Sequence, residues 1–118
     1  MKKLTQALVI GMIVAGGIAY AQTAATDPTV IARQDLMKSF GGAAKALGGM
    51  ASGEVAFDAA AAEAAKATLV TGSAEIAAKF TDNPSDPGSK AKPEIWTGWD
   101  AFVAKAQGLT DAATALDV

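Results

Sequence analysis

The sequence has 118 residues, the size of a single domain, with 10 basic and 12 acidic side chains and a net charge of −2. This mildly acidic balance argues against nucleic-acid binding, because neutralising phosphates takes clustered Lys and Arg. The chain has no cysteine and no histidine, which excludes disulfides, thiolate or imidazole metal ligands, thiol nucleophiles and the commonest general base.

The first segment, residues 1–21, has the pattern of a secretory signal. Lys2 and Lys3 form a basic start, residues 4–18 form an apolar core, and Ala-Tyr-Ala at 19–21 is a small-residue cleavage site. A transmembrane anchor is the alternative, but the apolar run is shorter than the ~20 residues that a bilayer requires. We therefore expect export with cleavage after Ala21, leaving a mature domain of residues 22–118 that has no membrane association.

The next segment predicts a helix over residues 28–47. Asp27 is a suitable N-cap and Pro28 suits the first helical position, while the pair Gly48-Gly49 is expected to end the helix. The pair Gly41-Gly42 costs about 1 kcal/mol per residue relative to alanine, so we expect another helix or a flat ligand to approach closely there. Heptad spacing places six side chains on one seam: Val30, Arg33, Met37, Phe40, Ala44 and Leu47.

Two further helices are predicted. One runs over residues 58–80 with Asp58 as its N-cap, and a loop rich in proline and turn-forming residues follows over 81–92. The other begins at Pro93 and has the clearest amphipathic pattern in the sequence. The predicted apolar faces are Ala62, Ala65, Leu69, Ile76 and Phe80 in the former helix, and Ile95, Trp99, Phe102, Ala106 and Leu109 in the latter.

The predicted class is therefore an all-α, up-and-down helical bundle. Only about 21 of the mature residues are large and apolar, because alanine supplies much of the hydrophobic content. An alanine-rich interior gives little transfer free energy, so either the fold is weak or a prosthetic group or partner fills its middle. Four helices are commoner than three, and the chain reaches Val118 without a C-terminal cap, so we expect a fourth helix to be missing.

Three segments resemble the class II c-type cytochromes, cytochrome c′ and its low-spin relatives: VIARQDLMKSFGG, AAKF and above all KPEIWTGWDAFVAKAQGL. The resemblance implies a periplasmic four-helix bundle, often a homodimer, with haem c between the helices. The family's fourth helix carries Cys-x-x-Cys-His, which this sequence lacks. The chain is thus expected to be a member truncated before that helix, by a real event or by a fragmentary record, and unable to attach haem covalently.

The resemblance also implies roles for four residues. Arg33 is expected near a haem propionate, whereas the residues alone favour an arginine that reaches the bundle end or pairs with Glu94. Met37 is expected on the distal side of the iron, where it either covers the sixth position or ligates the metal; the alternative is a core filler. Gln34 and Glu94 are expected at the haem edge, although Glu94 also suits a helix start.

The implied function is electron transfer with redox partner proteins, or the binding of a diatomic gas. The residues do not decide between these two. No enzymatic activity is expected, because none of the serines has a histidine to activate it. The alternative is a haem-free periplasmic helical interaction protein, or a non-functional relic.

Overall fold

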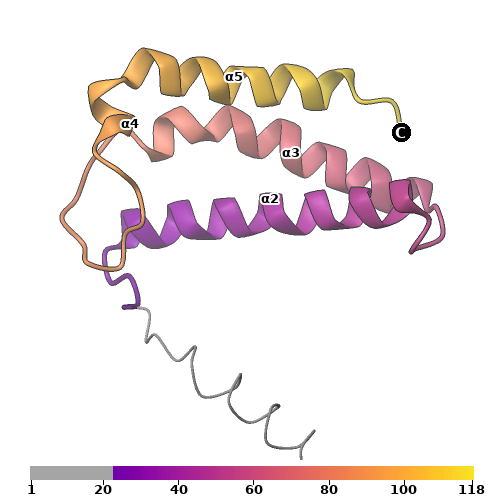
Figure 1. Ribbon diagram of the computed structural model, residues 1–118, viewed down its shortest axis with the longest axis horizontal. Coiled ribbons are helices and arrows are strands. Elements are labelled where there is room, and N and C mark those ends of the chain that lie inside the picture. Colours follow the sequence, from indigo (N-terminus) through magenta and orange to yellow (C-terminus); the bar gives the residue numbers. More distant parts are fainter. Residues whose placement is uncertain (1–22) are drawn as a thin grey trace, which may run out of the picture.

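The computed structural model describes residues 23–118, which form three long helices and one short one (Figure 1). The helices are α2 (Pro28–Ser52), α3 (Ala59–Lys79), α4 (Glu94–Thr97) and α5 (Trp99–Ala115). No strand occurs in this part of the chain, and the predicted all-α bundle is confirmed. The predicted signal segment lies outside the described residues.

Helix α2 begins where the sequence predicts and ends later. Asp27 Oδ1 accepts hydrogen bonds from the backbone N–H groups of Thr29 and Val30, at 2.8 and 3.4 Å. The predicted end at Gly48-Gly49 was wrong, because both glycines keep helical backbone. The helix ends instead at Gly53, whose φ of 81° favours glycine.

Helix α3 matches its prediction closely. Asp58 is the N-cap, and its Oδ1 accepts from the N–H of Ala61 at 3.0 Å. Phe80 is the C-cap, with its N–H donating to Ile76 O at 3.0 Å. Ala62, Ala65, Ile76 and Phe80 of the predicted face are buried, and Leu69 is half-buried.

The third predicted helix is divided at Gly98 into α4 and α5. The Gly98 N–H donates to Glu94 O at 2.9 Å, and its carbonyl accepts from the N–H of Phe102 at 3.1 Å. Hydrogen bonding therefore passes through the break, and the predicted apolar seam keeps its phase. All five seam residues are buried or half-buried: Ile95, Trp99, Phe102, Ala106 and Leu109.

Helix α3 lies between the two other long helices (Figure 1). It packs against both, whereas no Cα atom of α2 lies within 8 Å of a Cα atom of α5. The core forms where Ile76 and Phe80 meet Ala106, and the Phe80 and Phe102 rings lie 5.2 Å apart. Helices α2 and α5 thus lie on two sides of α3 without meeting, which leaves an open groove between them.

Candidate functional site

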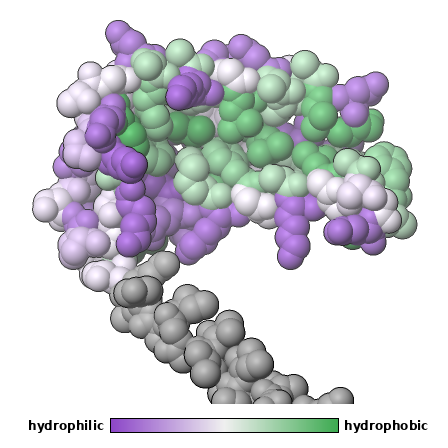
Figure 2. Space-filling view, viewed as in Figure 1, coloured by the Kyte–Doolittle hydropathy of each residue, from purple (hydrophilic) through white to green (hydrophobic). Residues whose placement is uncertain are grey.

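The groove contains a cavity of about 940 Å³ that is open on one side. Side chains from all four helices line it, together with the segments 23–25 and 88–91. The large apolar side chains that line it include Val30, Phe40, Ile76, Phe80, Phe102 and Leu109. Figure 2 shows apolar residues gathered across the middle of the molecule, with hydrophilic side chains around them. The seams predicted on three separate helices therefore meet around one space.

Charge is distributed unevenly around this cavity. Four of the eight basic side chains in residues 23–118 line it: Arg33, Lys38, Lys90 and Lys105. None of the 12 acidic side chains does. Although the chain has a net negative charge, every charged residue that lines the cavity is basic. This favours an anionic group at this position.

Arg33 is almost fully buried, with 3% of its surface exposed, and its partners are backbone carbonyls. Its Nε donates to Lys79 O at 2.7 Å, and its Nη2 donates to Asp82 O. The guanidinium also lies 4.9 Å from the centre of the Phe80 ring and 5.4 Å from that of Trp96. A cation at the C-terminal end of α3 is favourable, because that end of a helix carries a partial negative charge.

Desolvation by burial lowers the pKa of Arg33, and the charges of Asp82 and Asp27 oppose that change.

The pairing of Arg33 with Glu94 that the residues alone suggested is not formed. The two ion pairs in the described part of the chain join Lys38 to Asp35 and Lys79 to Glu75. Backbone carbonyl groups and two aromatic rings thus stabilise the charge of the Arg33 guanidinium in place of a carboxylate.

Gln34 and Met37 also line the cavity, one turn apart on α2. The Gln34 side chain donates from Nε2 to Gly88 O at 2.9 Å, which ties the loop 81–92 to α2. Met37 keeps 40% of its surface exposed. The structure therefore brings Arg33, Gln34 and Met37 together. Glu94 is exposed and does not line the cavity, whereas its neighbour Ile95 does.

Asp86 holds the loop in place beside the cavity. Its Oδ2 accepts from the N–H groups of Thr26 and Asp27, at 2.9 and 2.8 Å, and its Oδ1 accepts from that of Gly88 at 2.8 Å. These hydrogen bonds, with Asp27 first, lower the pKa of Asp86. A Cβ atom on Gly88 would overlap the backbone of Ala25, so the two cavity-lining segments need a glycine there.

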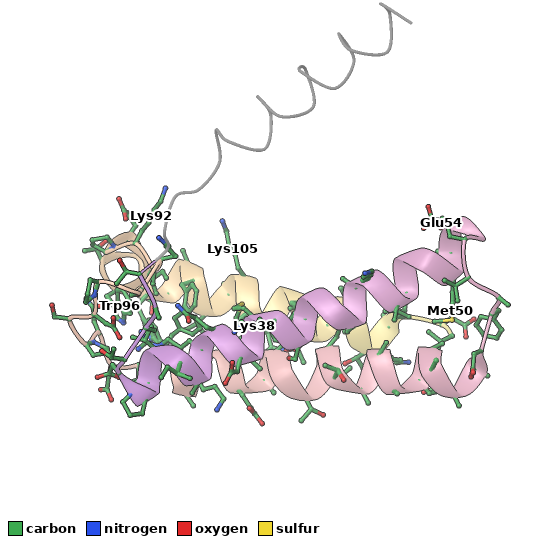
Figure 3. The ribbon with its side chains drawn as sticks, turned by 90° about the horizontal axis from the view of Figure 1, so that it is seen from below. Lys38, Met50, Glu54, Lys92, Trp96 and Lys105 are labelled. Carbon is green, nitrogen blue, oxygen red and sulfur yellow. The ribbon has the colours of Figure 1, made fainter. Side chains whose placement is uncertain are left out.

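The sequence reading missed Lys38, Lys105 and the role of Asp86. A signal for the lysines was present, because each directly neighbours a residue of a predicted seam, Met37 or Ala106. Figure 3 shows Lys105 and Lys92 on the same side of the molecule. No comparable signal existed for the role of Asp86 in joining the loop to α2, because Thr26 and Asp27 lie about 60 residues away in the sequence.

The residues present fit one side of a haem group. The volume lies within the ~300–1,000 Å³ typical of ligand pockets, the surface is apolar, and the surrounding cations suit carboxylates. The other side has no ligands in this chain, because the sequence has neither the cysteines for thioether bonds nor a histidine for the iron. Within residues 23–118, no cluster of three or more His, Cys, Asp or Glu side chains could hold a metal ion.

An all-α bundle with an open, apolar, cation-lined cavity between its helices has the architecture of helical proteins that bind a cofactor between their helices. The model of the cytochrome c′ family matches residues 28–118, and the chain belongs to that family. The family implies haem c as its cofactor, and without cysteine these 118 residues cannot attach it covalently.

Two relatives illustrate the similarity. Cytochrome c-556 of Agrobacterium fabrum is 38% identical over 117 residues, which are 98% of this chain and 75% of the relative. Cytochrome c-556 of Agrobacterium tumefaciens (strain apple 185) is 49% identical over 89 residues, which are 72% of this chain and 68% of the relative. Comparison with solved structures gave no significant match. In residues 23–118, no helix has the length and apolarity needed to cross a membrane.

Proposed function

We propose that these helices form the distal side of the haem pocket of a periplasmic class II cytochrome that transfers electrons. The observation that carries the proposal is the position of Met37. Among the residues of 23–118 that line the cavity it is the one thioether, and it comes from the helix that also contributes Arg33 and Lys38. A methionine beside an apolar, cation-lined space suits an axial ligand of iron.

Haem, when bound, supplies a one-electron redox centre. Met37 would offer that group a neutral sulfur, and ligation by a methionine sulfur would raise its reduction potential. The apolar side chains of Phe40, Phe102 and Leu109 would lie against the group and shield that side from water, which would also affect the potential. Arg33 and the lysines attract carboxylates to the edge of the cavity, and we assign the propionate position to Arg33 on this ground.

The remaining parts of the proposal concern location and partners. The predicted signal at residues 1–21 supports export to the periplasm. Redox proteins are the proposed partners, and the complete protein is proposed to be a homodimer. Gln34 and Glu94 remain predictions for the haem edge. Of the two, Gln34 has the stronger support, because it lines the cavity and Glu94 does not.

Binding of a diatomic gas is a second candidate, and one observation favours it. The Met37 side chain is 40% exposed, so it is free to cover the sixth position of an iron without bonding to it. The two candidates differ in one measurable property, the presence of a sulfur–iron bond. They share the same cavity and the same need for a proximal ligand.

The proximal histidine and the two cysteines would have to come from a segment outside these 118 residues. Reading the gene past the codon for Val118 tests this directly. We expect codons for Cys-x-x-Cys-His within ~40 codons, on the spacing of c-type haem attachment motifs. Their absence from every reading frame would contradict a covalent cytochrome and leave the haem-free alternative.

A further inference from the structure

Met37 and Met50 are the two methionines in residues 23–118, and both belong to α2, but their surroundings differ. Met37 lines the open cavity and keeps 40% of its surface exposed. Met50 is half-buried beside the turn between α2 and α3 (Figure 3), and its Sδ accepts a hydrogen bond from the N–H of Asp58 at 3.4 Å. Small molecules can therefore reach the Met37 side chain through the cavity, whereas Met50 is partly covered and its sulfur already has a donor.

An accessible thioether reacts with peroxides to give methionine sulfoxide. A sulfur lone pair attacks one oxygen of hydrogen peroxide, and an S–O bond forms as the O–O bond breaks. The attached oxygen then gives its proton to the departing hydroxide, which leaves as water. Sulfur loses two electrons and the peroxide gains two, so these two reactants balance the step. Access of the peroxide to sulfur is the main requirement, and a cavity of about 940 Å³ that is open on one side provides it.

The lining of the cavity also suits the product of this reaction. A thioether sulfur is a weak hydrogen-bond acceptor, whereas the sulfoxide is polar and its oxygen can accept hydrogen bonds. Arg33 and Lys38, on the same helix as Met37, line the cavity and are donors without any acceptor atom in their side chains. At Met50, by contrast, the new oxygen would have to replace the contact between the sulfur and the N–H of Asp58. The surroundings thus favour oxidation at Met37 over Met50.

We propose that Met37 is a site of reversible oxidation by peroxides, and that its sulfoxide removes the thioether that the proposed function assigns to iron. The modification itself rests on the cavity alone, and only its consequence for iron rests on the proposed function. Oxidation replaces a flexible apolar side chain by a polar one, so a single reaction changes the α2 side of the cavity. Methionine sulfoxide reductases reverse the reaction, which makes the change a switch.

Peptide mass mapping of the full chain, after timed exposure to hydrogen peroxide, measures the oxidation rate at each methionine. We expect Met37 to be oxidised several-fold faster than Met50 in the folded chain. In concentrated urea the two rates should converge, because the fold then no longer distinguishes the two side chains. Equal rates in the folded chain, or a preference for Met37 that persists unchanged in urea, would overturn the inference. This measurement contains no iron, so its failure leaves the proposed cytochrome function intact.

A second measurement tests the consequence for iron, using haemin with imidazole as the other axial ligand. The peroxide-treated chain should lack the sulfur–iron band of the untreated chain, and reductase treatment should restore that band. Met50→Leu, treated in the same way, is the control and should lose and regain the band as the native chain does. A band that persists after complete oxidation of Met37 would overturn the switch. A band already absent before oxidation would instead contradict the proposed ligand, and the selective oxidation of Met37 would stand on the mapping alone.

Discussion

Arg33 shows how one buried side chain can connect the fold to the site. It donates to carbonyls at the end of α3 and in the loop after it, lies against Phe80 and Trp96, and also lines the cavity. A buried cation of this kind is tolerated only where hydrogen bonds and dipoles replace its hydration. The same residue thus fixes the α2–α3 packing and contributes positive charge to the cavity.

Replacing Arg33 should destabilise the bundle. In Arg33→Met the carbonyls of Lys79 and Asp82 lose a charged donor, which should lower the free energy of unfolding by about 2 kcal/mol, the range for hydrogen bonds to charged groups. Arg33→Lys keeps the charge but loses the planar fork, so an intermediate loss is expected. Urea unfolding followed by circular dichroism measures both, and an unchanged midpoint for Arg33→Met would contradict this role.

Two glycines provide a second test at the residue scale, because their surroundings differ. A Cβ atom at Gly72 would lie 2.5 Å from Phe40 Cε1 and 3.1 Å from Leu36 Cδ1, whereas at Gly41 nothing lies within 4 Å. Gly72→Ala should cost about 1 kcal/mol, since overpacking of about 1–3 kcal/mol exceeds the gain in helix propensity. Gly41→Ala should stabilise by up to about 1 kcal/mol. The same unfolding experiment compares them, and a stabilised Gly72→Ala would refute the close packing.

At the scale of elements, the loop 81–92 depends on Asp86. The three N–H groups that Asp86 accepts from belong to Thr26, Asp27 and Gly88, so one carboxylate joins the loop to the start of α2. These bonds favour the charged carboxylate in the folded chain and lower its pKa. Because the folded pKa lies below the unfolded value of about 3.9, the contribution is complete above that pH. It is lost as the pH falls through the folded pKa.

Asp86→Asn should therefore lower the thermal midpoint at neutral pH, because the amide accepts fewer and weaker hydrogen bonds. The difference from the native chain should stay constant down to about pH 5 and shrink below about pH 4, where Asp86 of the unfolded chain takes up a proton. It should vanish once the pH lies below the lowered pKa of the folded chain, where the folded carboxylate is protonated as well. Thermal unfolding at a series of pH values measures this difference. Asp117→Asn is the control, and a difference independent of pH would contradict the role of the Asp86 charge.

The sequence predicted the starts of two helices correctly but missed one helix end and one break. Asp27 and Asp58 predicted helix starts correctly, because an N-cap bond involves only neighbouring residues. The end of α2 was missed, because the turn depends on Gly53 and on Val55, whose N–H donates to Gly49 O at 3.0 Å. The break at Gly98 was missed for a different reason. The hydrogen bonds that span it keep the apolar period intact, so the sequence pattern continues through the break.

For the whole molecule, the main feature is the open groove between α2 and α5. Seam periodicity predicted which faces are apolar, and the sequence placed Arg33 and Met37 on one of them. Periodicity cannot say that α3 lies between the other helices or that Lys38 and Lys105 line one cavity, because this depends on packing between helices. No other helix approaches Gly41-Gly42 closely, since nothing lies within 4 Å of a Cβ atom at either position. The approach of a flat ligand there stays a prediction.

An open groove predicts weak stability for the 118-residue chain. Apolar side chains such as Met37, which is 40% exposed, face the cavity without a covering element in residues 23–118. We expect a low thermal midpoint with little cooperativity, and binding of the apolar dye ANS before unfolding, since large exposed apolar patches are unusual on a stable monomer. A cooperative melt at high temperature, without dye binding in the native state, would contradict this.

The most direct test of the proposed function is a haemin titration of the full chain, with one equivalent of imidazole supplying the missing axial ligand. We expect a saturable Soret change at one haemin per chain and a sulfur–iron charge-transfer band. In Met37→Leu the Soret change should remain and the sulfur–iron band should be lost. Met50→Leu, altered at the far end of α2, should behave as the native chain (Figure 3). Identical spectra for the native chain and Met37→Leu, or no saturable change, would contradict Met37 as a ligand of haem iron.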